Sequence, residues 1–153
     1  MNDSKPKQPL DSYVKLEIIA LDPGARTFLT GFSPDGMVTE FAPGDVKRLC
    51  KLGHVIDKVS SRLTSPTVRH KERQRLKRIR LRTYSRISNL VSEVHWKSAD
   101  YLCRHYAVIL LPTFGTQKMV NKRAKRRVIN NDTARRLLMW SHYKFRQRLL
   151  HKG

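Results

Sequence analysis

Acidic side chains are scarce in this sequence, which has 12 Asp and Glu residues against 32 Lys and Arg residues. The excess positive charge falls into two blocks, because residues 62–86 contain ten Lys/Arg and one acid and residues 118–153 contain twelve and one. Positive charge gathered in this way is typical of nucleic-acid binding, since cations displace counterions from phosphates. The alternative is a basic tail or a solvated helix face. Apolar residues that recur at helical spacing within the same blocks argue against it.

Cysteines and long apolar runs are also scarce. Cys50 and Cys103 are isolated, so these 153 residues contain no C-x-x-C pair and encode no zinc ribbon. Free cysteines suit a reducing compartment, and we expect an intracellular protein. No run of about 18 apolar residues occurs, so we expect no transmembrane helix and no membrane partner. Residues 1–12 are polar and contain prolines, and we expect them to form a flexible tail.

The first apolar segment predicts a strand that ends in a turn. Ile18–Leu21 is an apolar run suited to a buried strand. Pro23-Gly24 ends it, because proline lacks an N–H and glycine tolerates a positive φ. Ser33–Gly36 is a second turn, and another apolar run ends at Pro112. We predict one sheet, in which the first and last strands end at the same edge, with strands near residues 13–21, 26–32, 36–41 and 107–111.

Helical patterns fill the rest of the chain. Residues 45–63 predict a helix with Asp45 as its N-cap, and residues 68–106 have apolar side chains three, four or eight apart without Gly or Pro. We therefore predict a helical hairpin insertion over residues 45–106. After a helix start at Asn131-Asp132-Thr133, one continuous helix is expected over residues 134–150. Its candidate core residues are Leu137, Leu138, Tyr143, Phe145, Leu149 and Leu150.

Asp22 stands at the end of the predicted first strand. A carboxylate in that place is costly to bury unless a cation or a metal compensates its charge. One interpretation is therefore a Mg²⁺ ligand in a phosphodiesterase site. The other is that Asp22 opens an Asx-Pro turn with its side chain half in water. The spacing alone favours the turn.

Three segments together resemble one protein family. The run Leu21-Asp22-Pro23-Gly24-Ala25-Arg26-Thr27-Phe28 is similar to the first RuvC motif of the TnpB and Fanzor proteins, which are transposon-encoded, RNA-guided DNA nucleases of the OrfB-type transposase family. Residues 108–120 resemble the region of the second RuvC motif. Residues 139–152 resemble the helix that follows it, especially in the eukaryotic and giant-virus branch. The matches occur in the same order as in the family, over residues 14–152. Together they favour the interpretation of Asp22 as a Mg²⁺ ligand over the interpretation as a turn residue.

The resemblance implies an α/β fold, namely a partial RNase H-like (RuvC) domain over residues 13–153. This domain would have a mixed sheet of about four strands, the long helical insertion and a C-terminal helix, with a basic loop and helix over residues 118–153. It would also be incomplete, because the family's guide-binding N-terminal lobe has no counterpart in these residues.

The resemblance also implies that Asp22 is a catalytic residue that binds Mg²⁺. Pro112 occupies the position of the family's second acid, and the neutral hydroxyl of Thr113 beside it is a poor replacement. Beyond Pro112 the sequence contains one acid, Asp132. The family's zinc ribbon and third acid would fall after Gly153.

We therefore predict a nucleic-acid-binding fragment of a TnpB/Fanzor-like RNA-guided DNA endonuclease that is catalytically incomplete alone, because two-metal hydrolysis needs several carboxylates. Two alternatives stay open. One is an active Mg²⁺-dependent nuclease whose site is completed by another chain, and the other is a non-enzymatic, basic RNA- or DNA-binding protein whose RuvC likeness is ancestral. The expected partners are DNA and RNA, including a guide RNA, and the oligomeric state is left open. The expected location is the nucleus of a eukaryote, or otherwise the cytoplasm or a virus-infected host cell.

Arginine dominates the candidate nucleic-acid contacts, and its planar fork matches phosphate oxygens. Trp140, His142 and Tyr143 could also stack on bases, although packing within the protein is the favoured interpretation. The candidate phosphate contacts are Arg26, Arg73, Arg75, Lys77, Arg78, Arg80, Arg82, Lys122, Arg123, Lys125, Arg126, Arg127, Arg135, Arg136, Lys144, Arg146 and Arg148.

Overall fold

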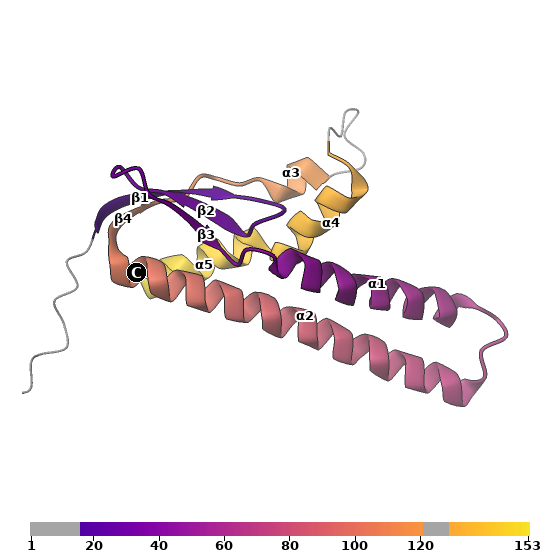
Figure 1. Cartoon of the computed structure of the whole chain (residues 1–153). Helices are drawn as coiled ribbons and strands as arrows, with labels where there is room; N and C mark the ends of the chain where they lie inside the picture. Colours follow the sequence, from indigo (N-terminus) through magenta and orange to yellow (C-terminus); the bar gives the residue numbers. More distant parts are fainter. Residues whose placement is uncertain (1–15, 121–128) are drawn as a thin grey trace, which may run out of the picture.

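The computed structural model describes residues 16–120 and 129–153 (Figure 1). The predicted tail over residues 1–12 and five predicted contacts, Lys122, Arg123, Lys125, Arg126 and Arg127, lie outside the described residues. The elements follow one another as β1 (Leu16–Pro23), β2 (Leu29–Phe32), β3 (Val38–Phe41), α1 (Asp45–Thr64), α2 (His70–His105), β4 (Tyr106–Leu110), α3 (Thr116–Val120), α4 (Asn131–Trp140) and α5 (His142–Lys152).

The four strands form one mixed sheet in the order β3-β2-β1-β4. β1 is antiparallel to β2 and parallel to β4, and Ala20 of β1 lies opposite both Phe32 and Leu110. The prediction of an α/β fold with a mixed, four-stranded sheet is confirmed. Because β1 and β4 run in parallel, Asp22 and the Leu111-Pro112 segment emerge at the same edge of the sheet, which we call the carboxyl edge.

Helices α1 and α2 form the predicted hairpin between β3 and β4, and it projects well beyond the sheet (Figure 1). The buried residues Leu49, Ile56 and Leu63 recur along one face of α1 and explain its packing on α2. Asp45 is the first residue of α1, so the prediction that it is the N-cap was wrong. The N-cap is Gly44, whose φ of 82° is readily adopted by glycine.

The C-terminal helix differs from the prediction, because α4 and α5 are two helices separated at Ser141, which has a φ of 52°. In one continuous helix, residues two apart point to nearly opposite sides. The break allows Trp140 and His142 to be buried together. The same region contains further errors, because Leu138, Tyr143 and Leu150 were predicted in the core and are more than half exposed.

The hydrophobic core lies between one face of the sheet and the helices. Ile19, Leu21 and Leu29 of the sheet are buried with Leu102 of α2 and Phe145 of α5. A core of this kind requires period-two burial along the strands, and Ile19 and Leu21 show it. No helix among the described residues has the length and apolar composition that are needed to cross a membrane.

The other face of the sheet is left open by the described helices. Phe32 and Val38 lie opposite each other in β2 and β3, and Val108 and Leu110 belong to β4. These four side chains are between 46% and 60% exposed. We call the surface that they form the open sheet face.

Candidate nucleic-acid interface

Asp22 lies at the carboxyl edge of the sheet with its side chain exposed, opposite Thr30 of β2. Pro112 and Thr113, which follow β4, are also exposed. Elsewhere, Asp35 accepts a hydrogen bond from the backbone N–H of Met37 at 3.1 Å in the second turn, and Asp132 pairs with Arg136 in α4. The carboxylates of Asp35 and Asp132 therefore interact within their own turn and helix and do not form a shared site with Asp22.

A Mg²⁺ ion needs several placed oxygen ligands to give up its waters. Over residues 16–120 and 129–153, no group of three or more His, Cys, Asp or Glu side chains could hold a metal ion. One exposed carboxylate beside neutral groups does not fit a two-metal centre. The described residues do not fit the metal site that the family resemblance implies.

The turn that follows Asp22 is held by the junction of α4 and α5. Trp140 Nε1 donates to the carbonyl oxygen of Ala25 at 3.3 Å, and His142 Nε2 donates to that of Gly24 at 3.1 Å. The ring of Phe28, at the far end of the turn, stacks on His142 with centroids 5.2 Å apart. These contacts fix the position of the turn relative to the helices, and hence the place where Asp22 leaves the sheet.

Two buried histidines complete this cluster. Burial lowers the pKa of His95 to about 4, and the nearby positive charge of Arg148 acts in the same direction, whereas the hydrogen bond to the Trp140 carbonyl opposes the shift. Burial also lowers the pKa of His142 to about 4. Both rings are therefore neutral at neutral pH. Because a guanidinium can only donate, His95 Nδ1 accepts from Arg148 Nη1 at 3.1 Å, and its Nε2 donates to the Trp140 carbonyl at 2.7 Å.

The first part of α2 with its preceding residue, residues 69–86, forms what we call the basic arm, which contains nine Lys/Arg and one acid. It lies in the part of the hairpin that projects beyond the sheet (Figure 1). Arg75, Arg78, Arg82 and Arg86 are exposed and are three or four residues apart, so they form a stripe along one helix face. Lys77 is exposed as well, and Arg80 is half-buried.

Four of the predicted phosphate contacts are engaged with the protein itself. Arg73 donates to the carbonyl oxygens of Leu63 and Ser65 at 3.2 and 3.4 Å and so satisfies the end of α1. Arg135 makes two hydrogen bonds to Asp57, of 2.6 and 2.7 Å, which lower the pKa of that carboxyl group. The other two are Arg136, which pairs with Asp132, and Arg148, which bonds His95.

The remaining described candidates are exposed. Arg26 lies in the turn after Asp22, and Lys144 and Arg146 lie on α5. Among the aromatic candidates for base stacking, Trp140 and His142 are buried, as the favoured interpretation predicted, whereas Tyr143 is 71% exposed. The structure thus gathers most free cations on the basic arm and on α5, and it withdraws Trp140 and His142 from the surface.

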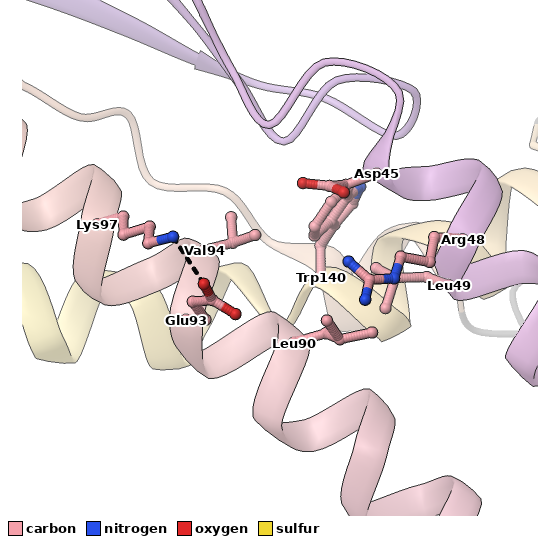
Figure 2. Close-up of a pocket in the computed structure, with 8 residues that line it drawn as sticks. All are labelled: Asp45, Arg48, Leu49, Leu90, Glu93, Val94, Lys97 and Trp140. Carbon is pink, nitrogen blue, oxygen red and sulfur yellow. Dashed lines mark hydrogen bonds and ion pairs between the residues drawn. The ribbon is translucent and has the colours of Figure 1, made fainter.

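A cavity of about 220 Å³ lies where the start of α1 meets α2 and Trp140 (Figure 2). Its rim carries Asp45 and Arg48 from α1 and Glu93 and Lys97 from α2, and the last two form an ion pair of 2.6 Å. Positive and negative side chains are equal in number at this rim. The cavity therefore lacks the one-sided charge that a phosphate ligand requires.

A second hollow was missed by sequence reasoning. Tyr84 of α2 and Leu138 of α4 line it together with Lys144 of α5. The available signal was weak, because Tyr84 is one aromatic residue in a strongly basic helix and Leu138 fitted a helical core pattern. The pairing of these residues depends on how α4 is placed against α2, which the local sequence does not specify.

Comparison with known proteins gives a consistent set of relatives. No protein-family model matches the chain. Three TnpB-like proteins of Acanthamoeba polyphaga mimivirus are each 26% identical to it over 141 residues, covering 87% of this chain and 25–26% of each viral protein. A candidate transposase of Paramecium bursaria Chlorella virus 1 is 26% identical over 135 residues, which cover 86% of this chain and 29% of that protein. The chain spans about a quarter of the length of the curated relatives that it matches.

Proposed function

We propose that this chain, which is similar over most of its length to TnpB-like proteins of the TnpB/OrfB-type transposase family, binds nucleic acid as part of a TnpB/Fanzor-like, RNA-guided DNA endonuclease. We further propose that its sheet and helices are a partial RuvC (RNase H-like) domain and that the 153-residue polypeptide does not cleave DNA by itself. Its partners are DNA and RNA, including a guide RNA.

The charge of the basic arm carries this proposal. Residues 69–86 contain nine cations and one acid. Of these cations, Arg73 alone has an evident structural role, at the end of α1, so the fold does not require the others. The stripe of exposed arginines is suited to a phosphate backbone, because the guanidinium fork pairs with phosphate oxygens. Lys144 and Arg146 add a second exposed basic surface on α5.

The topology supports the RuvC assignment. Three antiparallel strands, a helical insertion and a fourth strand parallel to the first are the arrangement expected from the resemblance, and Asp22 stands at the carboxyl edge. Asp22 belongs to no group of three or more possible metal-binding side chains among the described residues, which supports a binding role for this polypeptide. The exposure of Asp22 is the one observation that favours the alternative, a nuclease site completed by another chain.

A salt titration tests the binding proposal. We expect the purified chain to bind DNA and RNA at low salt and to lose affinity by orders of magnitude between about 50 and about 200 mM salt, because bound cations release counterions from phosphates. Fluorescence anisotropy with labelled oligonucleotides measures this loss. A flat titration, or no binding at the lower salt concentration, would contradict the proposal.

A plasmid-nicking assay separates the two readings of Asp22. With Mg²⁺ or Mn²⁺, we expect neither the parent chain nor an Asp22→Ala variant to cut supercoiled DNA, since a single carboxylate cannot clamp the attacking and leaving oxygens. Binding should persist in both proteins. Cleavage by the parent that Asp22→Ala abolishes would favour an active nuclease and disprove the proposed lack of activity.

A further inference from the structure

A groove of about 250 Å³ lies between α2 and the α4–α5 pair, at the point where the basic arm reaches the body of the protein. Tyr84, Leu138, Ser88, Lys144 and Arg148 line it, and we call it the Tyr84 groove. It lies apart from the carboxyl edge of the sheet, since neither Asp22 nor Pro112 contributes to its lining. None of the functional roles given above accounts for its composition.

The two largest exposed apolar side chains in the Tyr84 groove come from different helices. Tyr84 is 52% exposed on α2, and Leu138 is 57% exposed on α4. A single exposed apolar residue is ordinary on a protein surface. An aromatic ring and a branched aliphatic side chain that line one hollow form a surface for a flat apolar group.

The charge of the Tyr84 groove is one-sided. Lys144 and Arg148 line it, and no described Asp or Glu residue does. The cavity in Figure 2 is the useful contrast, because Asp45 and Glu93 there balance the two cations. A ligand of the Tyr84 groove should therefore combine a flat apolar body with negative charge.

Arg148 is held in place before any ligand arrives. Arg148 Nη1 donates to His95 Nδ1 at 3.1 Å. The central carbon of the same guanidinium group lies 5.4 Å from the centroid of the Trp96 ring. Because the neutral His95 ring takes one N–H of the guanidinium, other N–H groups of Arg148 stay available to an anion. A fixed guanidinium loses less conformational entropy on binding than a free one.

The Tyr84 groove lies in line with two other cations of the basic arm, on nearly the opposite side of α2 from the stripe of exposed arginines, because Tyr84 is two residues from both Arg82 and Arg86. Lys77, Arg80 and Tyr84 are three and four residues apart in α2 and therefore share one side of the helix. A strand of nucleic acid that follows the basic arm along this side meets the ring of Tyr84 next. Lys144 and Arg148 lie beyond it in the same hollow.

We propose that the Tyr84 groove binds one unstacked base of single-stranded nucleic acid, with the base packed against Tyr84 and Leu138 and its phosphate paired with Lys144 and Arg148. This inference rests on the proposed function and specifies the form of nucleic acid that the chain prefers. A duplex cannot use the groove without breaking a base pair, because its bases are already stacked and paired. DNA and RNA single strands offer the same base and phosphate groups.

The test compares three labelled ligands of equal length, oligo(dT), oligo(U) and a DNA duplex, at one salt concentration. The parent chain should bind both single strands more tightly than the duplex. A Tyr84→Leu variant, which keeps an apolar side chain but removes the stacking ring, should lose roughly tenfold in single-strand affinity. Its affinity for the duplex and the salt dependence of binding should stay unchanged, since no cation is removed.

Phe32→Leu is the matched control, because Phe32 is an aromatic residue of similar exposure that lies on the open sheet face and does not line the Tyr84 groove. It should retain the parent's affinity for all three ligands. Equal losses in the two variants, equal losses on single strands and duplex, or no loss in Tyr84→Leu would overturn the inference while leaving nucleic-acid binding intact. Absence of binding by the parent chain would instead contradict the proposed function. Thermal melting of each variant checks that it is folded.

Discussion

The two halves of α2 differ in composition and serve different purposes. The half that packs against the sheet and α5 contains the buried residues Val91, His95, Ala99 and Leu102. Its few charges are paired along the helix, as in Glu93–Lys97. The half that forms the basic arm contains one buried residue, Thr83, among the described positions of α2, and its positive charge is almost unopposed.

This contrast distinguishes charged side chains that have a partner within the fold from charged side chains that have none and repel one another. Where α2 is packed, each cation has a nearby acid, so self-repulsion is small. Where α2 projects, repulsion between like charges weakens the helix, and no internal contact offsets most of it. An arrangement that costs stability without a structural return is expected at a binding surface, where phosphates supply the missing negative charge.

The largest expected effect lies in the packed body. Phe28→Ala removes a fully buried ring that contacts His95, His142 and Phe145, and should lower the free energy of unfolding by about 3–5 kcal/mol. Ile79→Ala in the basic arm, where the side chain is half-buried, should cost clearly less. Urea denaturation measures both. Equal losses would show that the arm is packed as firmly as the body.

The next effect concerns binding. Replacing Arg78 and Arg82 with Gln should weaken nucleic-acid binding roughly tenfold to a hundredfold at low salt and reduce the salt slope by about two, one for each phosphate contact. Replacing Lys97 and Arg104 with Gln removes the same charge from the packed half and is the control. Both cations there already have acidic partners on the helix. Indistinguishable losses in the two variants would mean that only net charge matters.

The pH dependence of stability should come from the body. The pKa values of His95 and His142 are lowered from 6.5 to about 4 by burial in the folded state. The unfolded chain therefore binds these protons more readily, and the free energy of unfolding should fall as the pH drops from about 6.5 towards 4, by up to about 1.4 kcal/mol per pH unit for each histidine. Stability above pH 6.5 is unaffected by these groups.

A His142→Gln variant tests the source of this dependence, because the amide can still donate to the Gly24 carbonyl but does not titrate. Urea midpoints at about pH 7 and about pH 5 should differ less in the variant than in the parent. A parent whose stability does not change over this range would contradict the assigned pKa shifts.

The smallest effect is expected at the link between α1 and α4. The Arg135–Asp57 pair is largely exposed, and a double-mutant cycle with Arg135→Gln and Asp57→Asn should give a coupling free energy below about 1 kcal/mol. Nucleic-acid affinity should change little in Arg135→Gln compared with Arg82→Gln, because the guanidinium of Arg135 is already paired. A loss of affinity in Arg135→Gln as large as in Arg82→Gln would show that Arg135 contacts phosphate despite its pairing with Asp57.

Local patterns in the sequence were sufficient for the strands and the hairpin. The apolar run before Pro23 and the helical spacing over residues 68–106 are patterns formed by residues close together in the sequence. The strand β1 and the helix α2 confirm the two predictions. The break at Ser141 was not predictable in this way. It is stabilised by contacts from Trp140 and His142 to the Gly24-Ala25 turn, more than 100 residues earlier.

The same difference between local and long-range contacts separates the parts of the candidate site that were predicted from those that were not. The exposure of Arg75, Arg78 and Arg82 follows from their helical spacing opposite the apolar residues of α2. The pairing of Arg135 with Asp57, and of Arg148 with His95, joins residues 78 and 53 positions apart. Charge counting cannot detect such pairs, so it overestimated the number of cations that are free for phosphates.

The open sheet face has a consequence for handling the protein. At low ionic strength, the net charge of +20 keeps copies of the chain apart. Concentrated salt, which is needed to strip bound nucleic acid from a basic protein, also screens that repulsion. The exposed Phe32, Val38, Val108 and Leu110, of which the last three belong to the outer strands β3 and β4, can then meet their counterparts on other copies. The conditions that remove nucleic acid should therefore be the ones in which the purified chain aggregates.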